Sequence, residues 1–250
     1  MSGHNRWSKI KHQKAAMGNT KGRLFSKLIK EITVAARIGG GDPDHNARLR
    51  SALGLCKDAN LPSDTITRAI KKGTGELEGI NYEDCVYEGY GPNGVAMIIE
   101  CVTDNRNRTA SEIRSIFAKG GGNMGESNSV KFMFDRKGVI LLPPGATEDA
   151  VMEASLDSGA LDVIVHGADG FEVRTDAHDV YKVAAELEKK GFKPLESKAA
   201  FLPQTTVKLE GDKAAKMLKL LGMFDDCDDV QNVHANYEID EKLMEQLAGE

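Results

Sequence analysis

Cationic side chains recur at helical spacing near the start of the chain. Four of them, separated in turn by four, three and seven residues, share one face of a helix: Arg23, Lys27, Lys30 and Arg37. Only Glu31 dilutes this positive charge nearby. A solvated helix face usually mixes charges of both signs, whereas this stripe does not. The pattern predicts contact with phosphate groups, which give nucleic-acid binding its sequence-independent affinity.

More cations surround the only tryptophan, which precedes this stripe. The residues predicted to contact nucleic acid there are Arg6, Trp7, Lys9, Lys11, Lys14 and Lys21. An exposed indole can stack on a base. Alternatively, Trp7 packs with Ile10 and anchors this arm to the helices that follow. The residue types do not decide between these two roles.

Two further groups of basic residues could contact an anion. Arg68, Lys71 and Lys72 stand before Gly73, where they either bind phosphates or stabilise the end of a helix through its dipole. Arg106 and Arg108 lie in the polar run from Thr103 to Arg108, within an otherwise acidic part of the chain. That run is either ordinary turn chemistry or a second anionic contact.

The distribution of charge separates the first part of the chain from the rest. Up to Gly75 there are fifteen Lys and Arg against five acidic residues, a net charge of +10, and the remaining residues carry −15. The overall charge of −5 conceals this difference. Such asymmetry predicts a part that faces nucleic acid, joined to an acidic body.

Helices are predicted to position these cations. One helix has Thr20 as its N-cap and ends at Gly39, and a second begins at Asp42-Pro43, where an acidic N-cap precedes proline. A third spans residues 63–72 and precedes a glycine-bearing linker. We expect a basic helical bundle over residues 1–75.

The rest of the chain is predicted to alternate strands and helices. Residues 95–101 form a strand, a capping box at Thr109-x-x-Glu112 opens a helix, and Val130, Phe132 and Phe134 mark the next strand. Residues 138–202 have the complete ferredoxin-like order β-α-β-β-α-β. Beyond them, a strand, a helix and a strand (residues 205–239) complete a second set of this kind. The strand Tyr82 to Glu88 has no place in that set.

The predicted fold class is α+β. An N-terminal basic helical bundle (1–75) precedes two ferredoxin-like α/β domains, one of which is inserted in the other. The discontinuous domain comprises residues 76–137 plus 203–250, and the inserted domain comprises residues 138–202. The sequence does not indicate an oligomeric state.

Motif searches favour a protein without catalytic activity. The chain has no G-x-x-x-x-G-K-[ST] phosphate loop, no G-x-S-x-G nucleophile elbow and no H-E-x-x-H zinc motif. We therefore expect no catalytic residues, metal, cofactor or small-molecule substrate. Four scattered cysteines and the lack of a long apolar stretch predict a cytoplasmic protein without a membrane partner.

Several motifs together resemble the YebC/PmpR family, whose mitochondrial relatives include the translational activator of cytochrome oxidase. They span nearly the whole chain: Gly3-His4-Asn5-Arg6-Trp7, Phe25-Ser26-Lys27-Leu28-Ile29, Gly39-Gly40-Gly41-Asp42-Pro43, Ile70-Lys71-Lys72-Gly73-Thr74-Gly75-Glu76, Tyr87-Glu88-Gly89-Tyr90-Gly91-Pro92 and Thr103-Asp104-Asn105-Arg106-Asn107-Arg108-Thr109. Asn5 and Arg6 depart from the family's usual G-H-S-K-W, but they keep a polar residue followed by a positive charge.

This resemblance implies a three-domain cytoplasmic protein without known catalysis. Bacterial members of the family are commonly described as transcriptional regulators that bind promoter DNA, whereas others act in translation on the ribosome. The expected function is a nucleic-acid-binding regulator of gene expression, a DNA-binding transcriptional regulator in the first instance. The alternative is a ribosome-associated translation factor that binds ribosomal RNA.

Overall fold

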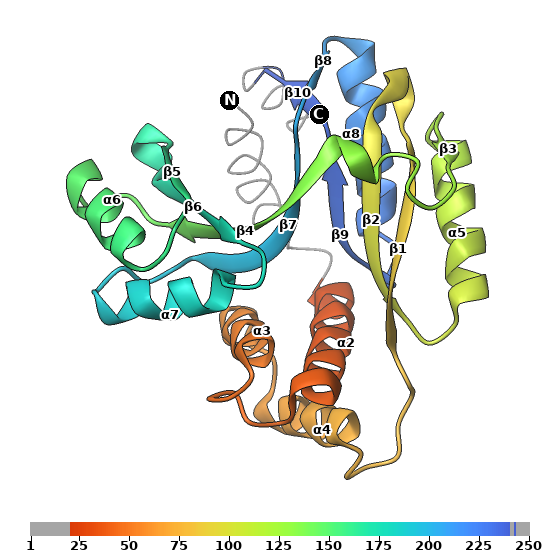
Figure 1. Ribbon diagram of the computed structural model, residues 1–250. Helices are drawn as coiled ribbons and strands as arrows, with labels where there is room; N and C mark the ends of the chain where they lie inside the picture. Colours follow the sequence, from red (N-terminus) through yellow and green to blue (C-terminus); the bar gives the residue numbers. More distant parts are fainter. Residues whose placement is uncertain (1–20, 241–242, 244–250) are drawn as a thin grey trace. The chain divides into compact units, whose positions relative to one another are not determined.

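The computed structural model describes residues 21–240 and Leu243, and it contains both helices and antiparallel sheets (Figure 1). The predicted α+β class, with a helical region first, is confirmed. The chain divides into two compact units. One contains Asp135–Leu202, and the other contains the described residues on either side of it. The partition into three domains stays a prediction.

Three helices form the N-terminal bundle: α2 (Lys21–Gly39), α3 (Ala47–Asp58) and α4 (Ser63–Thr74). Their apolar residues recur at helical spacing and meet in one core, which includes Leu28, Ile32, Leu49, Cys56 and Ala69. The apolar side of α2, which includes Leu28 and Ile32, therefore faces the core of the bundle. Thr20, the expected N-cap, lies outside the described residues.

The start of α3 differs from the prediction. The N-cap is Asn46, whose side chain accepts a hydrogen bond from the backbone N–H of Leu49. Asp42 instead forms a turn before the helix, where its carboxylate accepts from Asp44 N and contacts His45 Nδ1. Asn46 also donates to the carbonyl of Ala35, so it holds α3 against the end of α2.

Glycine is required where α4 crosses α2. A Cβ atom added at Gly73 would lie 2.4 Å from the carbonyl oxygen of Thr33 and 2.7 Å from Ala36 Cβ. Gly73→Ala is therefore expected to push the two helices apart and to lower the free energy of unfolding by about 1–3 kcal/mol. Urea denaturation followed by circular dichroism would measure this. Gly54→Ala on α3, where an added Cβ meets nothing within 4 Å, is the control, and equal effects would contradict the prediction.

The discontinuous part of the chain builds a four-stranded sheet with the order β3-β1-β2-β9. Its strands are β1 (Glu83–Tyr90), β2 (Ala96–Thr103), β3 (Asn123–Met124) and β9 (Val230–Ala235). Helices α5 (Arg106–Lys119) and α8 (Asp212–Asp225) share one hydrophobic core with this sheet. Within that core, Phe117 and Phe224 pack edge to face with ring centroids 5.0 Å apart.

This order differs from the ferredoxin-like order that was predicted for the discontinuous part. The strand without a predicted place, β1, is an inner strand that pairs with β2 from Glu83↔Thr103 to Tyr90↔Ala96. A short connection, which includes the 3-10 helix η1 (Pro92–Gly94), joins the two strands. A local hairpin costs little loop-closure entropy, so it takes the position expected for the distant segment 205–209.

Residues 130–134 are not the strand that was predicted. Lys131–Met133 form the 3-10 helix η2, and Phe132 is 71% exposed. The cause is Glu88, whose buried carboxylate accepts hydrogen bonds from the backbone N–H groups of Asn128, Val130 and Lys131. Two of these N–H groups belong to the expected strand and are thereby unavailable to a sheet.

Residues 205–239 contain a short parallel pair of strands apart from the main sheet. It consists of β8 (Val207–Leu209) and β10 (Tyr237–Ile239). Asn236 separates β9 from β10, and its side chain accepts a hydrogen bond from the backbone N–H of Ala96. The single strand expected over residues 230–239 is therefore divided at this residue.

The capping box expected at Thr109 is wrong. Helix α5 begins at Arg106, and its N-cap Asn105 accepts a hydrogen bond from Arg108 N. Thr109 lies inside the helix and is fully buried. Arg106 and Arg108 accordingly belong to the first turn of α5 rather than to a loop.

The unit Asp135–Leu202 has the strand order β5-β6-β4-β7, which is the ferredoxin-like order predicted for residues 138–202. Its elements are β4 (Phe134–Leu142), α6 (Glu148–Asp157), β5 (Asp162–Val165), η3 (Gly167–Asp169), β6 (Phe171–Asp176), α7 (Val180–Lys189) and β7 (Glu196–Pro203). Apolar residues of α6 and α7 pack on one face of this sheet.

Candidate nucleic-acid interface

The basic stripe of α2 contacts an acidic segment of the same compact unit. This acidic segment, Asp225-Asp226-Cys227-Asp228-Asp229, joins α8 to β9. Arg23 pairs with the carboxylate of Asp226. The Nζ atoms of Lys27 and Lys30 donate to the carbonyl oxygens of Asp225 and Asp228, both at 2.9 Å. Three of the four cations in the stripe therefore have partners within the chain.

Asp229 is the centre of this contact. Its side chain is 6% exposed and accepts hydrogen bonds from Lys30 Nζ at 2.6 Å, Arg108 Nη2 at 2.9 Å and Thr109 Oγ1 at 2.7 Å. Burial by itself would raise the pKa of Asp229, but the hydrogen bonds from Lys30, Thr109 and Arg108 lower that pKa to about 2. The carboxylate is thus held charged between α2, α5 and the start of β9.

The contacts restrict which cations of the stripe a phosphate could reach. The side chain of Lys30 is only 12% exposed, whereas that of Arg23 is 48% exposed. Lys27 is half-buried, and this burial lowers its pKa although Asp225 opposes the effect. Of these three residues, only Arg23 retains a substantial exposed surface.

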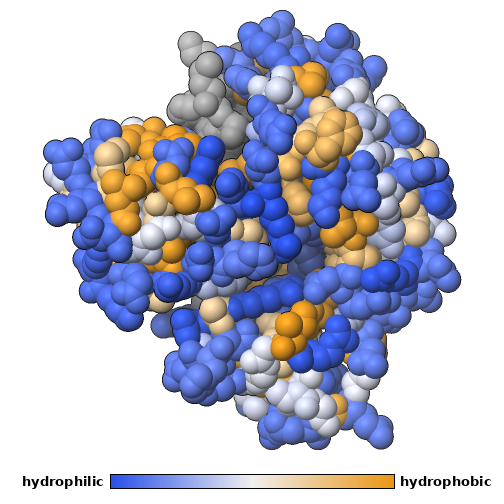
Figure 2. All heavy atoms as spheres, in the orientation of Figure 1, coloured by the Kyte–Doolittle hydropathy of each residue, from blue (hydrophilic) through white to orange (hydrophobic). Residues whose placement is uncertain are grey.

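Other predicted cations remain open to solvent. Arg37 in α2 and Arg68, Lys71 and Lys72 in α4 are exposed, and within residues 21–240 no ion pair is formed by any of them. We call these four residues the open patch. Arg68 and Lys72 are four residues apart on α4, so they share a face of this helix. Figure 2 shows a mainly hydrophilic to intermediate surface over α4. Lys21 is also exposed, with Nζ 6.0 Å from the ring centre of Phe25.

The helix-dipole alternative also fits part of the open patch. Lys71 and Lys72 occupy the last turn of α4, which ends at Gly75 in a left-handed conformation with φ of 83°. Cations at this end of a helix are stabilised by the dipole without any partner. A phosphate contact and the dipole effect are compatible, because the dipole does not use the donor hydrogens.

Arg106 and Arg108, the predicted second contact, have acidic partners. Arg106 Nε lies 2.9 Å from Glu83 Oε2. Arg108 Nη2 lies 2.7 Å from Asp104 Oδ1 and also bonds to Asp229. Turn chemistry does not explain them either, because both residues are helical. The arm residues Arg6, Trp7, Lys9, Lys11 and Lys14 lie outside the described residues.

A pocket of about 470 Å³ opens beside the open patch, where α2 and α4 meet the segment before β1. Arg37 and Lys72 line it together, so the structure brings one cation from each helix to a single site. Two other lining residues, Asn81 and Tyr82, were not predicted from the sequence. The signal for them was weak, because Asn81 follows the glycine-bearing linker and Tyr82 is only the first residue of the strand predicted to end at Glu88.

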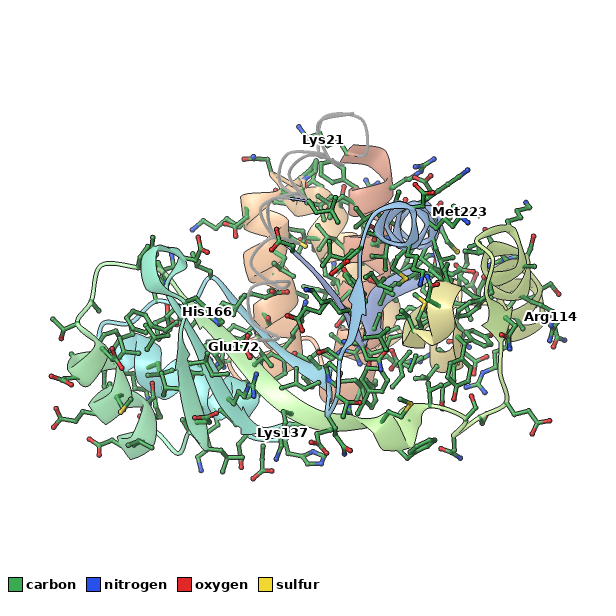
Figure 3. All side chains as sticks on the ribbon, turned by 90° about the horizontal axis from the view of Figure 1, so that it is seen from above. Lys21, Arg114, Lys137, His166, Glu172 and Met223 are labelled. Atoms are coloured by element: carbon green, nitrogen blue, oxygen red, sulfur yellow. The ribbon has the colours of Figure 1, made fainter. Side chains whose placement is uncertain are left out.

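The inserted unit has a buried charged cluster of its own. Figure 3 labels His166 and Glu172, whose Nε2 and Oε2 atoms are 3.8 Å apart, with side chains 3% and 1% exposed. The other carboxylate oxygen of Glu172 accepts a hydrogen bond from Arg174 Nε at 2.9 Å. Because Glu172 is buried and its partner Arg174 is only 25% exposed, their contact has the character of a structural ion pair.

Three other observations bear on the predicted chemistry. Within the described part of the chain, no three His, Cys, Asp or Glu side chains gather as ligands for a metal ion. The four cysteines carry free thiols. Among residues 21–240, no helix has the length and apolar character that a membrane crossing requires.

Two domain families match most of the chain. The TACO1/YebC protein N-terminal domain matches residues 5–76, and the TACO1/YebC second and third domain matches residues 82–237. The first match contains the basic bundle and the open patch. The second begins at Tyr82, in the pocket, and includes the acidic segment.

Relatives of similar length are known from several bacteria. A protein of Myxococcus xanthus named "Probable transcriptional regulatory protein" is 58% identical over 247 residues, which cover 99% of each chain. A Geobacter sulfurreducens protein with the same description is 54% identical over 248 residues, covering 99% of this chain and 100% of that one. A crystal structure of a conserved hypothetical protein from Aquifex aeolicus has a TM-score of 0.82 and 44% identity, covering 91% of this chain and 94% of that one.

Proposed function

Because the chain belongs to the TACO1/YebC family, we propose that it is a cytoplasmic, nucleic-acid-binding regulator of gene expression without catalytic activity. Its relatives are named "Probable transcriptional regulatory protein", which makes duplex DNA the first partner to test. The open patch is the observation that supports this proposal most directly. Its cations come from two helices packed against each other, and no acidic side chain within the described residues neutralises them.

Binding through the open patch should depend strongly on salt. Each neutralised phosphate contributes about −0.9 to the slope of log K against log salt concentration, so four contacts give a slope of about −3 to −4. Fluorescence anisotropy with labelled duplex DNA at several salt concentrations measures this slope. A slope near zero would contradict phosphate contact.

Specific regulation requires a second comparison. Crosslinking in cells followed by sequencing would identify the bound fragments, and a true target should bind about a thousandfold more tightly than random duplex. Equal affinities at physiological salt would rule out a specific regulator. General electrostatic attachment to nucleic acid would survive that result.

One observation also favours a translation factor that binds ribosomal RNA. A four-residue turn joins α3 to α4, as in a helix-turn-helix motif, in which the N-terminal residues of the second helix read the bases. In α4 the first turn carries Asp64, and the cations lie from the middle of the helix to its last turn. That arrangement suits phosphate contacts better than base recognition.

Ribosome sedimentation would distinguish the two partners. The intact protein should co-migrate with ribosomes if it binds ribosomal RNA, and the double variant Arg68→Glu/Lys71→Glu should not. If neither protein co-migrates, the translation candidate is wrong and the DNA candidate stands alone.

A further inference from the structure

We infer that the pocket between α2, α4 and the segment before β1 binds one nucleotide, with its base stacked on Tyr82 and its phosphate between Arg37 and Lys72. If the nucleotide belongs to a bound nucleic acid, this inference rests on the proposed function. The pocket is then the place where that nucleic acid inserts one nucleotide. A free nucleotide would present the same chemistry, so the two sources are separated by experiment below.

The charge of the pocket selects an anionic ligand. Among its lining residues the only charged side chains are Arg37 and Lys72, and no Asp or Glu is present to neutralise them. A planar guanidinium can bind two oxygens of one phosphate, and an ammonium group adds a compact positive charge. A cationic ligand is disfavoured by the same two residues.

The size and the lining suit a nucleotide rather than an isolated phosphate ion. A volume of about 470 Å³ falls within the range of small-ligand pockets and far exceeds that of one phosphate group. Asn81 adds an amide group that can bond to a sugar or to a base edge. The hydroxyl groups of Thr33 and Thr74 already donate within the chain, so they can add only acceptor oxygens.

Tyr82 provides a surface on which a base can stack. Its side chain is half-buried, and Lys30 Nζ lies 5.8 Å from the centre of its ring. Lys30 is itself fixed by Asp229 and by the carbonyl of Asp228, so the ring rests against an anchored neighbour. Any base can stack on an aromatic ring, so Tyr82 can accept a nucleotide whatever its base.

Glycines leave the pocket wall open to close approach. Gly40 and Gly75 both line it, and a Cβ atom added to either would meet nothing within 4 Å. Gly79 lies beside the stem of Lys72, where an added Cβ would be 3.1–3.2 Å from three of its carbons. The linker therefore lies against the stem of Lys72, although the residue as a whole remains exposed.

The test replaces Tyr82 without changing the charge of the protein. Tyr82→Leu keeps an apolar side chain but removes the ring, and Tyr82→Phe keeps the ring. Loss of one stacked base should weaken binding of the nucleotide about five- to 150-fold in the leucine variant and by less than about threefold in the phenylalanine variant.

Two probes separate the possible sources of the nucleotide. Isothermal titration calorimetry with adenosine and guanosine monophosphates detects a free nucleotide. Fluorescence anisotropy with a labelled ten-nucleotide single strand, as RNA and as DNA, detects a nucleotide within a polymer. Circular dichroism melting of each variant establishes that it is folded before the affinities are compared.

Each outcome decides the inference. Mononucleotide binding that Tyr82→Leu weakens supports a free ligand, and an effect confined to the single strands supports insertion from a polymer. If the wild type binds the single strand, Tyr82→Leu binds it equally and neither mononucleotide binds, the pocket is overturned while the proposed function stands. If the wild type binds no nucleic acid, the proposed function fails. In that case, mononucleotide binding that Tyr82→Leu weakens still supports the nucleotide pocket. If the wild type binds no mononucleotide either, the nucleotide pocket is overturned.

Discussion

Asp229→Ala is expected to lower the free energy of unfolding by about 3–5 kcal/mol, the usual cost of removing one partner from a buried ion pair. The variant would leave Lys30, only 12% exposed, without its carboxylate, and Thr109, fully buried, without its acceptor. Uncompensated burial of a charge costs more than the lost attraction alone. Urea denaturation followed by circular dichroism measures the change.

Asp226→Ala is the matched control, because Asp226 belongs to the same acidic segment and also pairs with a cation of α2. Its side chain is 64% exposed, so its removal should cost less than about 1 kcal/mol. If the two variants lost equal stability, burial would not determine the strength of this contact, and the assignment of Asp229 as its centre would be wrong.

The same residue makes stability depend on pH in the acidic range. The pKa of Asp229 is about 2 in the folded protein and lies below its ordinary value of 3.8, so its stabilising effect is complete above that ordinary value. The effect is lost as the pH falls through about 2. Between pH 5 and pH 2 the wild type should lose about 2 kcal/mol more than Asp229→Asn, which has no charge to lose.

Charge reversal of the open patch is expected to have the largest effect on function. Arg68→Glu/Lys71→Glu should weaken nucleic-acid binding by about a hundredfold or more and lower the magnitude of the salt slope by about 2, because two phosphate contacts become repulsive. Both residues are exposed without an ion pair among the described residues, so the unfolding free energy should change by less than about 0.5 kcal/mol. Anisotropy and urea denaturation on the same samples test both statements.

Lys213→Glu/Lys216→Glu makes the same change of charge on the exposed side of α8 and serves as the control. If it weakened binding as much as the open-patch variant, the effect would reflect total charge rather than a particular surface. Lys30→Glu provides the opposite comparison. It should destabilise the fold through Asp229, and any loss of binding that it causes could not be attributed to a phosphate contact.

Helical periodicity predicted which side of α2 faces the core, but it could not identify what covers the basic side. The cations Lys27 and Lys30 bond to residues 198 positions away in the sequence. A run of acidic residues such as 225–229 is usually a solvated turn. The neighbouring sequence does not distinguish such a turn from an acidic segment that contacts a distant helix. Tertiary contact therefore changed the predicted interface more than any error in secondary structure did.

The helix starts were misplaced for a related reason. Asp42 and Asn46 can each cap a helix, as can Asn105 and Thr109, and all are acceptable by residue type. The choice depends on tertiary contacts. Asn46 also bonds to Ala35, and Thr109 is drawn inward to Asp229. Sequence locates such starts to within about four residues when two capping residues lie one helical turn apart.

Strand prediction succeeded where connections are regular and failed where they are not. Residues 138–202 form one complete β-α-β-β-α-β set without an interruption, and their order was correct. In the discontinuous part, alternation of apolar residues located β2, but the partners of each strand depend on contacts such as that of Asn236 with Ala96. Side-chain hydrogen bonds of this kind leave no periodic signal.

The buried contact of Lys30 with Asp229 also bears on how the protein can be engineered. The helical bundle is not a portable module, since grafting it onto another protein would separate Lys30 from the carboxylate that balances it. A chimera that takes α2 from a protein without a cation at the position of Lys30 should therefore also replace the segment that joins α8 to β9. Lys30 and Asp229 should therefore be kept or replaced together, although most of the chain lies between them.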